Sequence, residues 1–366
     1  MSNKSDVYRV TDCPVPNGLG NHHEGLDALL SLMANHDLKF YQTGEETSLG
    51  GKDGLIDKSD VVLIKVNAQW KYRGCTNSDV IRGVIQRILE HPDGFGGEIV
   101  LFENGQGGGS LDCDTMWSDR YPDTGVHANA EDESHSFSYL VDTAFADPKV
   151  SKYILDPVRE TFISKEDHST DGYRKLGKVS YPCFTSAKGN RIELREGIWN
   201  GTSYDENLKL VNVPVLKHHM GCGITGALKS FCGVLSMSDD GYGERHYEKL
   251  GQHCGEMISR VRTPVINILD CIWVSQGTLA GFPPENTTRL NELLASVDPV
   301  ALDYLAAKHL LFPIDKDKEH NPDKFDPLRD HLIQARDVIN SKGGINGHKV
   351  TLNESKINLI SSRCLK

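Results

Sequence analysis

The 366-residue chain lacks a membrane-spanning run, because no stretch approaches about 18 consecutive apolar residues. It also lacks an excess of positive charge: 40 lysines and arginines against 51 aspartates and glutamates give a formal net charge of −11. Proteins that bind nucleic acid or anionic membranes normally carry a basic surface, so both kinds of partner are disfavoured. The opening residues MSNKSDVYRV have no apolar leader core, and we therefore expect a cytoplasmic protein.

Paired cysteine spacings are also missing, since the nine cysteines include no Cys-x-x-Cys pair. An odd number without such pairs indicates neither a disulfide framework nor a zinc ribbon, and an iron–sulfur cluster is disfavoured for the same reason. We expect mostly reduced, buried thiols. Cys222 lies beside the pocket predicted below and is a candidate nucleophile or metal ligand, although a buried thiol near a glycine turn is the commoner case.

Apolar runs alternate with helical patterns, which predicts an α/β fold with a mainly parallel sheet flanked by helices. DVVLIKVNA (60–68) has the pattern of a buried strand, residues 76–89 repeat apolar side chains at helical spacing, and residues 96–106 supply the next strand. This order predicts two parallel strands joined by a right-handed crossover. An inserted β-hairpin is expected over 180–196, where residues alternate around a Lys-Gly-Asn turn.

The later part of the chain repeats the order of strand, turn and helix. We predict a strand over 207–217 and a helix over 224–235. The apolar face of this helix consists of Ile224, Leu228, Phe231 and Leu235. The remaining predicted elements are a helix over about 247–261, a strand over 264–274, a helix over 298–311 with Asp298 at its N-cap, a helix over about 327–340 and a strand near 356–361.

We expect one elaborated domain rather than two. Residues 1–59 form an N-terminal extension packed on the core, residues 60–312 the α/β core, and residues 313–366 a helix and strand that complete it. The core includes a long loop, 105–132, whose ENGQGGGS start lacks the lysine of a phosphate-binding loop and the spacing of a dinucleotide-binding loop. A mobile lid is the preferred interpretation of that loop.

Polar side chains follow four of the predicted strands at the point where each strand ends. In open parallel sheets, ligands bind beyond the carboxyl ends of the strands. The sequence therefore predicts one pocket at this edge. Its residues are Lys65 and Asn67, Glu103 and Asn104, Lys217 with His218 and His219, and Asp270.

Three lysines favour an anionic ligand. Lys65, Lys217 and Lys229 could form a local positive site for a phosphate or carboxylate, helped by free N–H groups at helix starts near Asn77 and Gly223. The predicted substrate-binding residues are Lys65, Asn67, Asn104 and Lys229.

Acid-base or metal chemistry is assigned to His219 and Asp270, with Lys217 as a third catalytic residue. The neighbours His218 and His219 point to opposite sides of an extended segment, so His219 shares the face of Lys217. An imidazole and a carboxylate at neighbouring strand ends can transfer protons or hold a divalent metal ion. NHHE (21–24) is a rival metal cluster, but it precedes any clearly predicted strand.

The blocks VLIKVN, EIVLFENG, PVLKHH, TGALKSFCGVL, NILDCIWV and SVDPVALD, in this order, resemble domain of unknown function family 362 over roughly residues 60–308. Many members carry a ferredoxin-type segment and are labelled iron–sulfur proteins, whereas this chain lacks that cysteine run. The family has no settled general reaction. The resemblance implies that the motif positions are Lys65, Asn67, Lys217, His219, Lys229, His246, Asp270, Asp298 and Asp303.

These patterns favour a cytoplasmic enzyme that acts on a small anionic substrate, with a divalent metal ion as a candidate cofactor. Two alternatives stay open: an iron–sulfur or other redox protein that uses scattered cysteines, and a non-catalytic binding or assembly protein. The sequence does not specify the substrate, the reaction or the oligomeric state. A homo-oligomer is one of the states that stay open.

Overall fold

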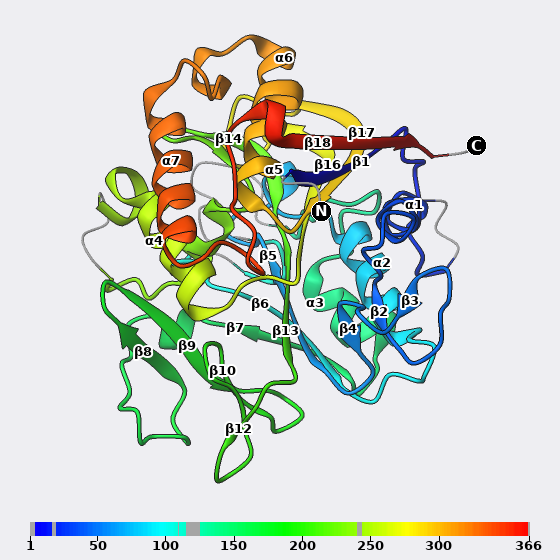
Figure 1. The fold of residues 1–366 in the computed structure, drawn as a ribbon, viewed down its shortest axis with the longest axis vertical. Helices are drawn as coiled ribbons and strands as arrows, with labels where there is room; N and C mark the ends of the chain where they lie inside the picture. The colour runs from blue at the N-terminus through cyan, green and yellow to red at the C-terminus, as the bar shows by residue number, and fades with distance from the viewer. Residues whose placement is uncertain (1–3, 17–19, 109, 115–124, 240–243, 365–366) are drawn as a thin grey trace.

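The computed structural model describes residues 4–16, 20–108, 110–114, 125–239 and 244–364. It has the predicted α/β fold, with a large, mainly parallel sheet flanked by helices and a separate antiparallel sheet (Figure 1). Within the described parts of the chain, none of the helices has the length and apolar character that a bilayer crossing requires.

Among the described residues the main sheet has ten strands, and neighbouring strands on its main path are parallel except where β17 pairs with β1 and β16. Its central strands therefore end at one edge. In spatial order the main path is β18 (Ile357–Arg363), β1 (Ser5–Thr11), β17 (Thr287–Ser296), β16 (Ile266–Ser275), β13 (Leu208–Val213), β5 (Val61–Val66), β6 (Glu98–Glu103) and β7 (Val150–Ile154).

Two further strands extend this edge. β14 (Val215–His219) runs parallel to β16, and β15 (Gly223–Thr225) turns back antiparallel to β14. The strand predicted over 207–217 is thus divided at Pro214, which separates β13 from β14. A proline has no N–H to donate to a ladder, which suits it to such a break.

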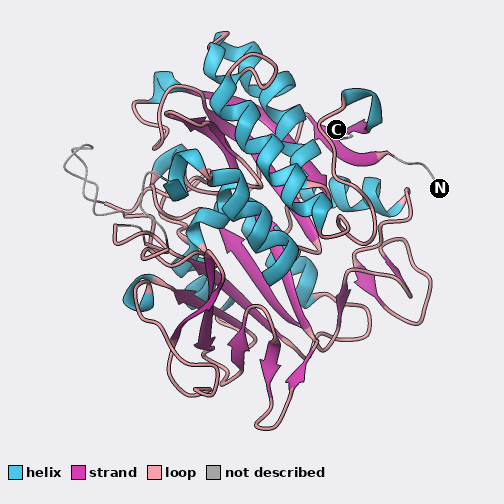
Figure 2. Cartoon of the chain, turned by 60° about the vertical axis from the view of Figure 1, so that its left-hand side comes forward, coloured by secondary structure: helices cyan, strands magenta, loops and turns pink. Residues whose placement is uncertain are grey.

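Helices cover both faces of the main sheet, and Figure 2 shows helices of one face in front of the strands. Val62 and Ile64 of β5 belong to one apolar core and Val61 and Leu63 to the other, which is why β5 appears in the sequence as a continuous apolar run. One face is packed against α1 (Glu24–Ala34), α2 (Ser78–Leu89) and α3 (Phe137–Tyr139), and the other against α4 (Leu250–Glu256), α5 (Pro299–Ala306) and α7 (Asp326–Ser341).

Smaller elements surround this core. The hairpin predicted over 180–196 is present as β9 and β10, inside a five-stranded antiparallel sheet. A three-stranded parallel sheet lies nearer the N-terminus. The bounds are β8 (Gly172–Leu176), β9 (Val179–Thr185), β10 (Arg191–Glu193), β11 (Gly197–Trp199), β12 (Tyr204–Asp205), β2 (Tyr41–Gln42), β3 (Gly50–Gly51), β4 (Ile56–Asp57) and α6 (Phe312–Asp315).

Several local predictions match the structure, but some strands and one helix of the fold were not predicted. Asp298 caps α5 as predicted, and α2 starts near Asn77 as predicted. The side chain of Asn77, which was not predicted as a cap, accepts hydrogen bonds from N–H groups of the first turn of α2. Strands β1, β7 and β17 and helix α1 were not predicted, and β1 lies inside the main sheet, between β18 and β17. Of the predicted loop 105–132, residues 109 and 115–124 lie outside the described residues.

The helix predicted over 224–235 is wrong. The chain instead forms β15 and then a short 3₁₀ helix, η5 (Lys229–Gly233). The reason is a contact from α5: the carboxylate of Asp303 accepts hydrogen bonds from the N–H groups of Ala227 (2.6 Å) and Leu228 (2.9 Å). Gly226 packs directly on that carboxylate, at a distance that leaves no room for a Cβ. This long-range contact fixes a turn where periodicity indicates a helix.

Candidate functional site

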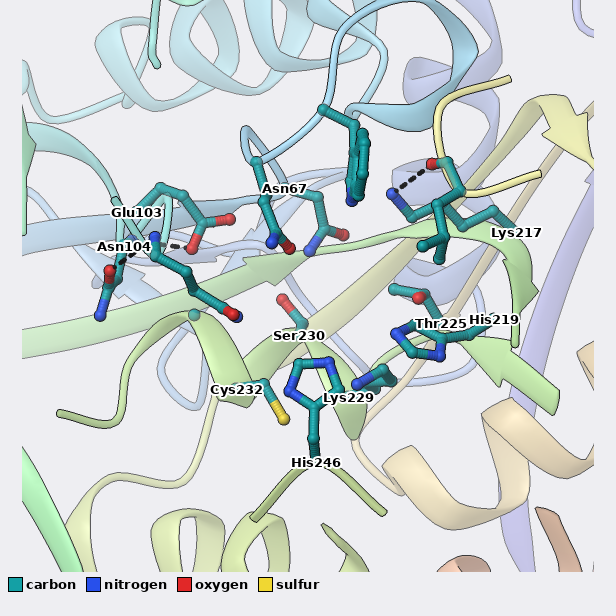
Figure 3. Close-up of a pocket in the computed structure, with 15 residues that line it drawn as sticks. Asn67, Glu103, Asn104, Lys217, His219, Thr225, Lys229, Ser230, Cys232 and His246 are labelled. Carbon is teal, nitrogen blue, oxygen red and sulfur yellow. Dashed lines mark hydrogen bonds between the residues drawn. The ribbon is translucent and has the colours of Figure 1, made fainter. Parts of the chain in front are cut away.

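A cavity of about 40 Å³ lies beyond the carboxyl ends of β5 and β6 and beside β14 (Figure 3). The segments after β5 and β6, the strands β14 and β15, and η5 contribute most of its wall. The lining residues are Asn67, Gln69, Trp70, Glu103, Asn104, Gln106, Lys217, His219, Thr225, Lys229, Ser230, Cys232, Gly233, His246 and Leu279.

The predicted site residues divide into those that line the cavity and those that do not. Asn67, Asn104, Lys217, His219 and Lys229 all line it, although they come from segments up to 162 positions apart (229 − 67 = 162). The parallel order of the strands brings them to one edge.

Two other predicted residues, Lys65 and Asp270, are absent from the described lining. The fully buried carboxylate of Asp270 accepts hydrogen bonds from the backbone N–H groups of Asn77 (2.8 Å) and Ile272 (3.0 Å). The carboxylate of Asp270 therefore takes the N–H of Asn77 at the start of α2, which the sequence analysis assigned to a ligand anion. The structure does not place Asp270 with His219 on the cavity wall, as a shared metal ion would require.

Lys65 lies behind the cavity, in an ion pair with Glu103. Its Nζ is 3.0 Å from Oε1 of Glu103 and donates to the carbonyl oxygen of Val66 (2.7 Å). Burial lowers the pKa of Lys65 and raises the pKa of Glu103 to about 7, while the attraction between the two opposes both shifts. Oε1 of Glu103 also accepts from the backbone N–H of Asn104, so the pair joins the ends of β5 and β6.

The alternation of side chains along β14 follows the prediction. Lys217 and His219 line the cavity, whereas Nδ1 of His218 lies 2.9 Å from Nε2 of His320. Because successive side chains of a strand point to opposite faces, β14 presents a lysine and a histidine to the cavity and a second histidine elsewhere.

Lys217 is a buried lysine held by backbone carbonyls. Its Nζ donates to the carbonyl oxygens of Gly74 and Leu279, the latter at 2.9 Å. Burial is the main reason that its pKa falls to about 7, and the charges of Lys229 and Lys65 lower it further. Lys217 can therefore exist in both protonation states near neutral pH.

His219 and His246 lie side by side in the cavity wall, with ring centroids 5.3 Å apart. Burial, and then the charge of Lys229, lower the pKa of His219 well below its ordinary value and that of His246 to about 2. Both rings are consequently neutral at neutral pH. Nδ1 of His219 lies 3.0 Å from the carbonyl oxygen of Met220, which can only accept. In the tautomer that donates from Nδ1 to this oxygen, Nε2 is the basic nitrogen.

Two cysteines near the cavity behave differently. Cys222 Sγ lies 2.9 Å from Nδ1 of His219, and burial raises the pKa of this thiol to about 12. Cys232 lines the cavity, and a hydrogen bond from Cys254 together with the charge of Lys229 lowers its pKa to about 6. All nine cysteines are free, and only Cys364 is not buried.

Sequence reasoning from strand ends missed several lining residues. Thr225 lies in β15, and Ser230 and Cys232 lie in η5. All three fall in the stretch predicted as a regular helix, so the assumed helical period did not indicate their direction. His246 was found only through the family resemblance. The one signal in the sequence for the missed residues was their position in the block TGALKSFCGVL, next to Lys229.

The fold and the cavity together define an α/β protein with a lysine- and histidine-lined pocket at the carboxyl ends of its parallel strands. Residues 194–308 match the family model described as "Domain of unknown function (DUF362)", which confirms the family resemblance over this segment. The matched residues include Lys217, His219 and Lys229, whereas Asn67 and Asn104 lie before it. No curated protein and no solved structure matches the chain.

Proposed function

We propose that the chain is an enzyme that acts on a small molecule bearing a carboxylate or phosphate group, and that this group binds in the cavity between Lys217 and Lys229. The observation that supports this proposal is the field of Lys229. Its positive charge contributes to the lowered pKa values of Lys217, His219, His246 and Cys232. Such a field in a largely buried pocket favours an anion.

The size of the cavity restricts the part of the ligand that enters it. At about 40 Å³ it is far below the several hundred Å³ of a pocket that encloses a whole metabolite. A single oxyanion group fits this space best. The rest of the substrate would lie outside the cavity.

Lys217 and His219 are the proposed catalytic residues. An ammonium group has three donors, and two of those of Lys217 reach the carbonyls of Gly74 and Leu279, which leaves one for the ligand among the contacts of the described residues. With a pKa of about 7, Lys217 can donate or accept a proton. Neutral His219 offers Nε2 as a base on the same face of β14. Asp270 is assigned a positioning role at the start of α2 instead.

Binding is tested by thermal unfolding with a panel of carboxylated and phosphorylated metabolites. A compound that stabilises the wild type should have little effect on Lys217→Met and Lys229→Met, because methionine keeps most of the aliphatic stem and removes the charge. Lys178→Met, at an exposed position in the turn between β8 and β9, is the matched control and should respond like the wild type. Unchanged stabilisation of both cavity variants would refute the proposed anion site.

Turnover is tested separately by following each stabilising compound by NMR, with and without added divalent metal ions. His219→Gln should abolish chemical conversion while the thermal shift persists, since it removes the base and keeps both lysines. If the wild type binds compounds and converts none of them, the chain is a binding protein and the enzymatic part of the proposal is wrong.

A further inference from the structure

A cluster of metal-ligating side chains lies outside the cavity, where His218 leaves β14 on the side away from Lys217. Ligand atoms of His218, Asp317 and His320 all lie within 4.8 Å of one another. Asp317 caps the short helix η10 (Lys318–His320), which ends at His320. The cluster thus joins a strand of the main sheet to a segment about a hundred residues further along the chain.

The two imidazoles already have a separation suited to a metal ion. Nδ1 of His218 lies 2.9 Å from Nε2 of His320. Two ligands that meet at right angles, each about 2.1 Å from an ion, are separated by roughly 3 Å, and a tetrahedral arrangement needs only a few tenths of an ångström more. The carboxylate of Asp317, which also accepts a hydrogen bond from the N–H of Glu319, has a ligand atom within 4.8 Å of both imidazoles and supplies the third ligand.

A second carboxylate orients one of the ligands. Nδ1 of His320 lies 3.2 Å from Oδ1 of Asp315, so this nitrogen carries a hydrogen, and Nε2 is the ring nitrogen that faces His218. Metal-binding histidines usually donate their other N–H to a carboxylate in this way. A metal ion could replace the hydrogen now shared by the two rings, with His218 in its other neutral tautomer.

We infer that His218, Asp317 and His320 form a binding site for a divalent transition-metal ion such as Zn²⁺. Two imidazoles and one carboxylate favour zinc, cobalt or nickel over magnesium and calcium, which prefer oxygen ligands. Three protein ligands leave a fourth position for water. The side chain of His320 is fully buried, whereas His218 and Asp317 are partly exposed, which gives the ion a route to the site.

The charge around the cluster suits a cation. Asp315, Asp317 and Glu319 each act on His218 as negative neighbours. A bound ion would tie the segment of η10 to β14, the strand that carries Lys217 and His219. Metal binding should therefore stabilise the fold, and the inference does not depend on the proposed function of the cavity.

The test uses the full chain freed of metal by a chelator, with Zn²⁺ titrated by calorimetry. Wild type should bind one ion at this site. His218→Ala should weaken its affinity by at least about 100-fold, Asp317→Asn should also weaken it, and Asp315→Asn should do so by about 10- to 100-fold through the orientation of His320. His348→Ala, an exposed histidine elsewhere, is the matched control and should bind like the wild type.

Co²⁺ distinguishes this site from binding to the cysteines. The bound ion should show ligand-field bands without the thiolate charge-transfer absorption that a cysteine ligand produces. Because His218→Ala could disturb folding, circular dichroism of each metal-free variant accompanies the titrations, and Asp317→Asn and Asp315→Asn decide the result if His218→Ala does not fold. Wild-type affinity in the folded variants, no binding by the wild type, or a thiolate band would each overturn the inference.

Discussion

Gly233 packs so closely against Glu103 that a Cβ at Gly233 would overlap Oε1 of the carboxylate and lie 3.0 Å from Nζ of Lys65. The glycine is required here by close approach, because the carboxylate is held in place by Lys65 and by the N–H groups of Asn104 and Ala68. The buried ion pair at the ends of β5 and β6 therefore packs directly against Gly233, the last residue of η5.

Gly233→Ala should destabilise the fold by about 1–3 kcal/mol, since an added methyl group must displace a carboxylate that is fixed by several partners. Urea unfolding gives the free energy directly. Gly44→Ala is the matched control, because a Cβ at that position meets no atom within 4 Å and the substitution should not destabilise the chain. Equal effects of the two substitutions would contradict the packing argument.

Glu103→Gln should destabilise the fold by about 3–5 kcal/mol, because it leaves the fully buried Lys65 without its counter-charge. The substitution also replaces one carboxylate oxygen by an NH₂ group. That group would face a backbone N–H of Ala68 or Asn104, which can only donate. The measurement is the free energy of unfolding in urea, repeated for Lys65→Met and the double variant. The double variant should be more stable than the sum of the single effects predicts.

The control for this pair is the ion pair between Lys152 and Asp142, whose side chains are 31% and 58% exposed. Asp142→Asn should cost no more than about 1 kcal/mol, since water screens an exposed pair. A cost for Glu103→Gln as small as that of the control would show that the buried pair does not hold the strand ends together.

The binding of an anion should weaken as the pH rises above 7. The pKa of Lys217 is lowered to about 7 in the free protein, and an anion beside it favours the charged form. Below pH 7 the lysine is charged with or without ligand, whereas above pH 7 binding requires the uptake of a proton. Affinity for a carboxylate whose own charge is constant should fall by up to about tenfold per pH unit above 7.

Calorimetry between pH 6 and 9 measures this dependence, and buffers with different ionisation heats report the proton uptake. Lys217→Met should bind weakly with a flatter pH profile, while Lys178→Met should keep the wild-type profile. A wild-type affinity that is constant from pH 6 to 9 would exclude Lys217 as the titrating group.

Asp270 should make the fold less stable as the pH rises toward neutrality. Burial raises its pKa from 3.8 to about 7, so between these values the folded chain holds a proton that the unfolded chain has lost. The stabilisation from this group is complete below about pH 4 and is lost as the pH passes through about 7. Asp270→Asn cannot titrate, so the stability of the wild type relative to this variant should fall from pH 5 to pH 8.

The size of this relative change should be on the order of 1–4 kcal/mol, since each unit of pKa difference corresponds to about 1.4 kcal/mol. Urea unfolding of both proteins at pH 5, 6, 7 and 8 provides the comparison. Subtracting the variant removes the contributions of other buried carboxylates such as Asp303, whose pKa is also raised to about 7 by burial. Parallel stability curves for the two proteins would show that Asp270 does not titrate in this range.

Local patterns in the sequence predicted several strands and helices of the fold and part of the candidate site. The apolar run of β5, the amphipathic spacing of α2 and the cap at Asp298 depend on residues a few positions apart, and each is found where it was predicted. The same holds for Lys217 and His219, because the two-residue period of a strand places them on one face wherever the strand lies.

Tertiary structure alone decided the features that depend on distant partners. Asp303, 75 positions after Leu228, turns a segment with helical periodicity into a turn and a short 3₁₀ helix. Burial, rather than residue type, sets the pKa of Lys217 near 7, and a hydrogen bond from the N–H of Asn77 holds the carboxylate of Asp270 at the start of α2. Periodicity reports which face of an element is apolar, but desolvation and hydrogen bonding at a buried site depend on which other segments pack there. A single sequence does not specify that packing in advance.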